Sequence, residues 1–156
     1  KESPRVAVRF GYDERIAHRI IAGSDLFLMP SRFEPCGLTQ MYAMRYGTIP
    51  IARATGGLCD TIYPLYVRQE VGGATGILYV GDRAEHLAST LKFAHEVARD
   101  SGALAALRRN AMLADHSWER SAKSYLELYR SLGLPTTTTT KTAEPSRAEL
   151  SQADPS

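Results

Sequence analysis

The segment from Pro30 to Gln40 joins a carboxylate, a glycine and the start of a helix, and it reads PSRFEPCGLTQ. It follows an apolar run, so the N–H groups of Gly37, Leu38 and Thr39 are expected at a helix N-terminus, where free amides and the helix dipole favour an anion. Beside them, the carboxylate of Glu34 can accept hydrogen bonds from sugar hydroxyls. The combination suits a glycosyl phosphate. The alternative is that Glu34 and Thr39 only cap the helix.

A second turn, Thr55-Gly56-Gly57, follows the next apolar run. Its glycines would let a phosphate approach the backbone closely, although Gly-Gly turns are common structural features. The turn is followed by neither Gly-Lys-Ser nor Gly-Lys-Thr, and the sequence has no Gly-x-Gly-x-x-Gly, so neither a P-loop nor a dinucleotide fingerprint is present. The turn becomes a functional candidate only if it faces the first loop across one edge of a sheet.

Other chemistries have less support. The 4 histidines and 2 cysteines show no metal-ligand spacing, so we expect no metal site. Cys36 could act as a nucleophile at the helix N-terminus, but no histidine is close to it in the sequence. Trp118, Tyr125 and Tyr129 have the spacing of a helical core face, and we expect them to pack inside the fold.

The elements that must position these loops alternate along the chain. Strands are expected at residues 5–10, 26–29, 49–52 and 76–80, and helices at 14–22, 38–46, 58–62, 83–99, 102–114 and beyond Ser117. This alternation predicts an α/β fold, a Rossmann-like parallel sheet flanked by helices. Ligands of such sheets bind beyond the carboxyl ends of the strands, where both loops are expected.

Composition limits the function further. The 156 residues carry 19 Lys plus Arg and 17 Asp plus Glu, a net charge of +2 that does not favour nucleic acid. The longest apolar run is too short to span a bilayer, no signal peptide is visible, and 2 cysteines suggest a reducing compartment, so a cytoplasmic protein is expected. Residues 1–133 are expected to form one domain, and the Thr-, Pro- and Ser-rich residues 134–156 a disordered tail.

Residues 31–62, SRFEPCGLTQMYAMRYGTIPIARATGGLCDTI, closely resemble the bacterial glycogen synthase and starch synthase family, as do residues 11–30 and 116–129. EPCGLTQ followed by Arg-x-Thr-Gly-Gly-Leu is the most specific part. The resemblance implies a retaining glucosyltransferase that moves glucose from ADP-glucose, or UDP-glucose in some members, to the non-reducing end of an α-1,4-glucan. It also implies a GT-B fold of two Rossmann-like domains, of which this chain looks like the C-terminal, donor-binding one.

The resemblance also implies residue roles. Glu34 would be the catalytic carboxylate that contacts the glucose hydroxyls. Among the substrate-binding residues, Tyr12 would lie near the adenine, and Cys36 and Gly37 would contact the glucose. Leu38 and Thr39 would contact the diphosphate, and Gln40 would support their loop. Thr55 and Gly56 would lie near the phosphate and the glucose. Fixed hydrogen-bond donors would stabilise the departing diphosphate without a metal or another cofactor.

Two departures from the family pattern matter. Many related glycosyltransferases have a second Glu eight residues after the first, where this chain has Tyr42, which fits the glycogen synthase branch. The family's N-terminal domain, with its Lys-x-Gly-Gly-Leu loop and the basic residues that clamp the diphosphate, is not among these 156 residues. We therefore expect the chain alone to be inactive and the N-terminal domain to be its partner.

Two other readings stay open. The chain could be a non-catalytic nucleotide-sugar-binding module or a remnant without activity. It could also come from another two-domain glycosyltransferase or from a glucan phosphorylase, which would need a lysine for pyridoxal phosphate. Lys92 and Lys123 are expected on helices away from the loops, and Lys141 lies in the tail, so the phosphorylase has little support.

Overall fold

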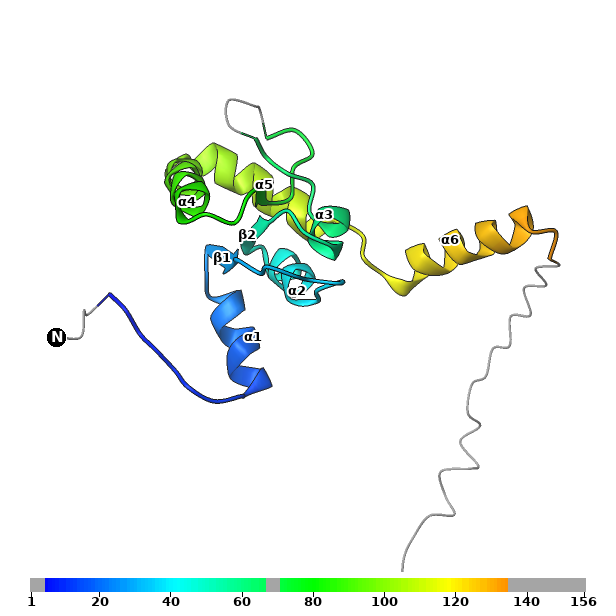
Figure 1. Ribbon diagram of the computed structural model, residues 1–156, viewed down its shortest axis with the longest axis horizontal. Coiled ribbons are helices and arrows are strands. Elements are labelled where there is room, and N and C mark those ends of the chain that lie inside the picture. Colours follow the sequence, from blue (N-terminus) through cyan, green and yellow to red (C-terminus); the bar gives the residue numbers. More distant parts are fainter. Residues whose placement is uncertain (1–4, 67–70, 135–156) are drawn as a thin grey trace, which may run out of the picture. The chain divides into compact units, whose positions relative to one another are not determined.

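The computed structural model describes residues 5–66 and 71–134, in two compact units that meet at the His116–Ser117 bond (Figure 1). The first unit contains α1 (Glu14–Ala22), β1 (Leu26–Met29), α2 (Thr39–Tyr46), β2 (Ile49–Arg53), α3 (Gly57–Thr61), β3 (Ile77–Tyr79), α4 (Ala84–Arg99) and α5 (Ser101–Leu113). The second unit contains α6 (Trp118–Ser131). The predicted tail, apart from Leu134, lies outside the described residues.

The three strands form a parallel sheet in the order β1-β2-β3. Leu28 is paired with Ile51 of the central strand, and Ile51 is paired with Ile77 on the other side. The central strand has its first four residues buried, as expected for a parallel strand covered on both faces. The parallel sheet predicted from the alternating pattern is therefore confirmed.

The core lies on both faces of this sheet, because successive strand residues point to opposite sides. On one face, α2, α4 and α5 contribute to the larger cluster, which consists of Met44, Ile49, Ile51, Leu65, Ala74, Ile77, Ala94, Val97, Leu107 and Ala111. On the other face, α3 contributes to a smaller cluster of Met29, Ala52, Leu58 and Ile62. Helices on both faces were predicted, and these clusters confirm it.

Three local signals mark helix ends where the sequence predicts them. The carboxylate of Asp13 accepts a hydrogen bond from the Ile16 amide at 3.0 Å and caps α1. Ser117 caps α6, and Gly47 ends α2 in the left-handed conformation. These local signals set where the connecting loops begin and end.

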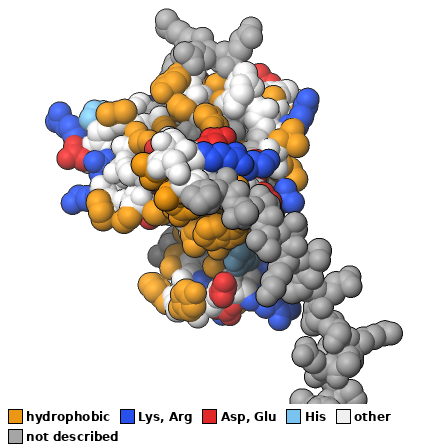
Figure 2. Space-filling view, turned by 90° about the vertical axis from the view of Figure 1, so that its right-hand side faces the viewer, with side chains coloured by type: hydrophobic (Ala, Val, Ile, Leu, Met, Phe, Trp, Pro, Cys, Tyr) orange, Lys and Arg blue, Asp and Glu red, His pale blue; other side chains and the backbone are white. Residues whose placement is uncertain are grey.

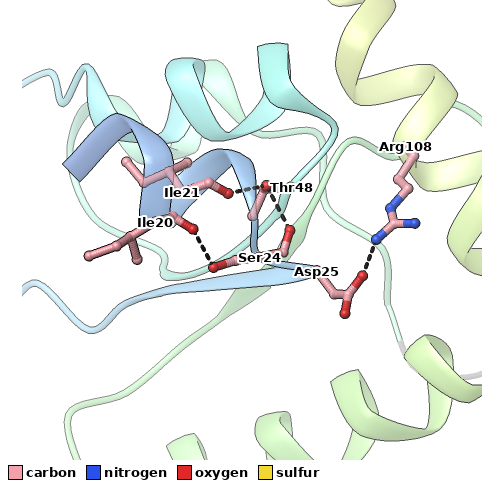
Figure 3. Close-up of polar contacts among 6 residues, drawn as sticks. All are labelled: Ile20, Ile21, Ser24, Asp25, Thr48 and Arg108. Atoms are coloured by element: carbon pink, nitrogen blue, oxygen red, sulfur yellow. Dashed lines mark hydrogen bonds and ion pairs between the residues drawn. The ribbon is translucent and has the colours of Figure 1, made fainter. Parts of the chain in front are cut away.

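The amino edge of the sheet is held by a polar network around Thr48 (Figure 3). The buried Thr48 hydroxyl lies 2.7 Å from the Ile21 carbonyl oxygen and 2.9 Å from that of Ser24, so its single hydrogen is shared between the end of α1 and the turn after it. The carboxylate of Asp25, at the start of β1, forms an ion pair with Arg108 of α5. This network fixes α1, β1, β2 and α5 at the edge opposite the two candidate loops.

The predicted strand over residues 5–10 is wrong. Among the described residues nothing pairs with residues 6–10, and the side chains of Val6 and Phe10 are 65% and 92% exposed. Alternating apolar residues favour a strand, but a strand persists only when a neighbour satisfies its backbone groups and a face covers its side chains. In this structure the segment runs as an extended lead into α1 (Figure 1).

The α6 aromatic residues are not covered within their own unit, and their predicted packing inside the fold stays a prediction. Trp118 is 85% exposed, Tyr125 and Tyr129 are half-exposed, and α6 has no buried residue. The two tyrosine rings lie side by side on α6, with centroids 6.4 Å apart. Helical spacing gives a helix an apolar side, but it does not supply the surface that would cover that side.

Charged and hydrophobic side chains are mixed on the visible face of the molecule (Figure 2). In the part of the chain that the structure describes, no helix combines the length and the apolar character that crossing a membrane requires.

Candidate functional site

The two candidate loops meet at the carboxyl edge of the sheet. The first, residues 30–38, follows β1, and the second, residues 54–56, follows β2. At the end of the second loop, the Gly57 amide lies 3.1 Å from the Glu34 carbonyl oxygen and 3.2 Å from that of Pro35. The second loop therefore faces the first loop across this edge. This is the condition under which the sequence analysis made the second loop a functional candidate.

The paired glycines of the second loop are explained by this contact. A Cβ on Gly56 would lie 1.9 Å from the Glu34 carbonyl oxygen, and a Cβ on Gly57 would lie 2.6 Å from the Cα of Cys36. Gly56 also has a φ of +47°, which L side chains rarely adopt. The backbone of the first loop therefore fills the space that a side chain would need. Contacts of Thr55 and Gly56 with a phosphate stay a prediction.

The carboxylate of Glu34 is half-buried and is held from within its own loop. The hydroxyl of Ser31 donates a hydrogen bond to Oε2 of Glu34 at 3.3 Å. This bond uses one lone pair of one carboxylate oxygen, and the other lone pairs remain available for hydroxyl groups. The side chain can thus act as an acceptor at the mouth of the loop.

The N-terminus of α2 is open. Its N-cap residue is Leu38, with no side-chain cap, so the alternative that Glu34 or Thr39 caps the helix is wrong. Within residues 5–66 and 71–134, no acceptor receives the amides of Gly37, Leu38 or Thr39. Free amides before and at the start of a helix favour an anion, and the binding of a phosphate at this end of α2 stays a prediction.

Gln40 supports the first loop from below, as the sequence predicts. Its side chain is fully buried, and Nε2 lies 3.1 Å from the Cys36 carbonyl oxygen and 2.9 Å from that of Gly37. The same nitrogen lies 3.1 Å from the hydroxyl oxygen of Thr61, which itself donates to the Gly57 carbonyl in α3. One buried amide thus joins the first loop to α3, the helix that follows the second loop.

The other predicted residues lie at the surface. Cys36 is exposed and free, and contact of its backbone with a ligand stays a prediction. Tyr12 is 94% exposed and precedes α1, which places it at the carboxyl edge of the sheet, but the structure gives it no contact with the two loops. In the described part of the chain, no three His, Cys, Asp or Glu residues gather as metal ligands would.

Arg53 is a residue that sequence reasoning missed. It ends β2, and its Nη1 donates a hydrogen bond to the Arg32 carbonyl oxygen in the first loop at 3.0 Å. The Arg-x-Thr-Gly-Gly-Leu string contains Arg53, but only the fold shows that its side chain reaches across to the first loop. Arg53 is the second connection from β2 and its loop to the loop that carries Glu34.

Residues 8–111 match the family described as Glycosyl transferases group 1. The chain belongs to this family. Among its glycosyltransferase relatives, the glycogen synthase of Anaeromyxobacter sp. (strain K) is 50% identical over 133 residues, which are 85% of this chain and 27% of that protein. The glycogen synthase of Koribacter versatilis is 49% identical over 128 residues, 80% of this chain and 25% of that protein. The chain therefore spans about a quarter of the length of these relatives.

Solved glycosyltransferase structures show the same fold. The catalytic domain of starch synthase IV from Arabidopsis thaliana, bound to ADP and acarbose, aligns with a TM-score of 0.68 and 40% identity over 78% of this chain and 25% of that one. Sucrose-phosphate synthase from Thermosynechococcus elongatus aligns with a TM-score of 0.58 and 28% identity over 83% of this chain and 30% of that one. With the parallel sheet and the family match, these structures confirm the predicted fold class, a Rossmann-like part of a GT-B glycosyltransferase, and the resemblance to glycogen and starch synthases.

Proposed function

We propose that this glycosyltransferase chain is the donor-binding half of a retaining glucosyltransferase that extends an α-1,4-glucan from ADP-glucose. The observation that carries the proposal is the pairing of the open α2 amides with the carboxylate of Glu34 on one short loop. The amides suit a diphosphate, and the carboxylate suits the hydroxyl groups of the sugar attached to it. A sugar nucleotide presents both groups side by side.

The proposed reaction depends on fixed donors. As the bond between glucose and the diphosphate breaks, negative charge grows on the departing phosphate, and the amides of Gly37, Leu38 and Thr39 stabilise it. Glu34 holds the glucose hydroxyls and thus places the anomeric carbon. The amides stabilise the charge on the departing diphosphate, and Glu34 orients the glucose. We therefore propose that the reaction needs neither a metal nor a cofactor besides the donor.

The choice of donor and acceptor rests on the relatives. The Arabidopsis structure is of a starch synthase bound to ADP and acarbose, which supports ADP-glucose over UDP-glucose and a glucan acceptor for this chain. The relatives named above are glycogen synthases. The free state of Cys36 and Cys59 is compatible with a reducing compartment, and we propose a cytoplasmic enzyme.

A titration tests the proposal. The native polypeptide that contains these residues is titrated with ADP-glucose, UDP-glucose, ADP and UDP in the absence of divalent metal. We expect the tightest binding for ADP-glucose and transfer of glucose to glycogen by the same preparation. Binding of ADP-glucose without transfer by the native polypeptide would favour the non-catalytic module, and absence of binding would favour a remnant.

A further inference from the structure

Arg53 connects the end of the central strand to the loop that carries Glu34. Its Nη1 donates to the Arg32 carbonyl oxygen at 3.0 Å, two residues before Glu34. A second bond holds the same loop two residues further along the chain, where the Gly57 amide donates to the Glu34 carbonyl oxygen at 3.1 Å. The short segment between these two bonds carries the carboxylate, and the Ser31 hydroxyl steadies the carboxylate itself.

The electrostatic setting of Arg53 is unusual. The residue is half-buried, its Nε is buried without an acceptor, and no carboxylate among the described residues forms an ion pair with it. Withdrawing an uncompensated guanidinium from water costs free energy. The hydrogen bond that the structure shows for this side chain is made with the Glu34 loop.

The diphosphate side of the site is held differently. The open amides of Leu38 and Thr39 lie beyond Gly37, and buried Gln40 holds the carbonyls of Cys36 and Gly37 from below. Loss of the Arg53 bond would therefore loosen residues 31–34 but leave the α2 N-terminus in place. A change at Arg53 should therefore affect the binding of the sugar more than the binding of the diphosphate.

We propose that Arg53 is a positioning residue, which holds Glu34 where it can accept hydrogen bonds from the donor sugar. This inference rests on the proposed function, because it presumes a sugar bound at Glu34. It predicts that Arg53 contributes to the affinity for the whole sugar nucleotide and not to the affinity for the nucleoside diphosphate alone.

The test compares Arg53→Met and Arg53→Lys in the native polypeptide, with Arg109→Met on the exposed side of α5 as the matched control. Arg53→Met keeps the aliphatic chain and removes every donor. It should weaken ADP-glucose binding about fivefold, as loss of one hydrogen bond would, and leave ADP binding unchanged. Arg53→Lys should recover part of the affinity, and Arg109→Met should match the unmodified protein.

A double-mutant cycle shows whether Arg53 acts through Glu34. In a Glu34→Gln background, Arg53→Met should weaken donor binding by much less than fivefold, because the carboxylate that it positions is gone. Hydrogen exchange gives a readout that needs no ligand: the Gly57 amide, which donates to the Glu34 carbonyl oxygen, should exchange faster in Arg53→Met than in Arg109→Met.

Several results would overturn the inference. Equal losses of ADP and ADP-glucose affinity would mean that Arg53 contacts the diphosphate itself. A full fivefold loss in the Glu34→Gln background would mean that it acts independently of Glu34, and unchanged donor affinity or unchanged exchange would remove the positioning role. If the unmodified polypeptide binds no sugar nucleotide, the proposed function fails first, and this inference fails with it.

Discussion

The Gly57 amide donates a hydrogen bond over 3.1 Å to the carbonyl oxygen of Glu34, although 22 residues of chain separate the two positions. This bond fastens the loop after β2 to the loop after β1. It also explains why glycines are needed at the turn, since any side chain on Gly56 would occupy the place of the Glu34 carbonyl. The candidate carboxylate is thus positioned by a contact that leaves its own side chain free to bind.

Gly56→Ala should destabilise the fold and displace the Glu34 loop. The new Cβ would meet the Glu34 carbonyl oxygen at 1.9 Å, and alanine would have to adopt the positive φ of this position. We expect the free energy of unfolding to fall by about 3 kcal/mol, measured by urea denaturation. Gly73→Ala is the control, because nothing lies within 4 Å of its added Cβ. Similar stability of both variants would contradict the loop contact.

Glu34→Gln should lower turnover without unfolding the protein. The amide keeps the size of the side chain but loses the charge and part of the acceptor capacity that the glucose hydroxyls need. In the native polypeptide we expect kcat for glucose transfer to glycogen to fall about a hundredfold, with an unchanged unfolding temperature. Glu96→Gln on the exposed side of α4 should have no effect. Unchanged kinetics of Glu34→Gln would remove Glu34 from the site.

Thr48→Val should destabilise the amino edge of the sheet. The single hydrogen of this fully buried hydroxyl is shared by the carbonyl oxygens of Ile21 and Ser24, and valine would remove it. We expect a loss of about 2 kcal/mol in the free energy of unfolding. Thr90→Val is the matched control, because the Thr90 hydroxyl bonds to His86 on an exposed part of α4. A loss no larger than that of Thr90→Val would contradict the role of Thr48.

Residues 1–156 alone should not elongate a glucan. The site described here offers an anion-binding helix end and a carboxylate, while the acceptor site and the basic clamp of the diphosphate are expected in the other domain of the relatives. We expect no transfer of radiolabelled glucose from ADP-glucose to glycogen by the purified chain, with the native polypeptide as the positive control. Measurable elongation by the chain would contradict the proposal that it is one half of the enzyme.

Local signals in the sequence predicted much of the fold. Buried apolar runs indicated β1, β2 and β3, and Asp13, Gly47 and Ser117 marked helix ends at the residues where the structure has them. These predictions succeed because capping and side-chain periodicity act over a few residues. The same rules failed for residues 5–10, whose alternating pattern suits a strand but which have no neighbouring strand to pair with among the described residues.

For the candidate site, the sequence by itself determined which groups are present: a carboxylate at Glu34, the amides before and at the start of a helix, and a glycine turn after the next strand. Only the tertiary structure decided that Gly56 and Gly57 fit against the backbone of the Glu34 loop, and that Arg53 reaches the carbonyl of Arg32. The physical reason is the distance along the chain over which each interaction acts. Residue type and short spacing fix what a segment can do, whereas contacts between distant segments depend on the order and register of the strands that carry them.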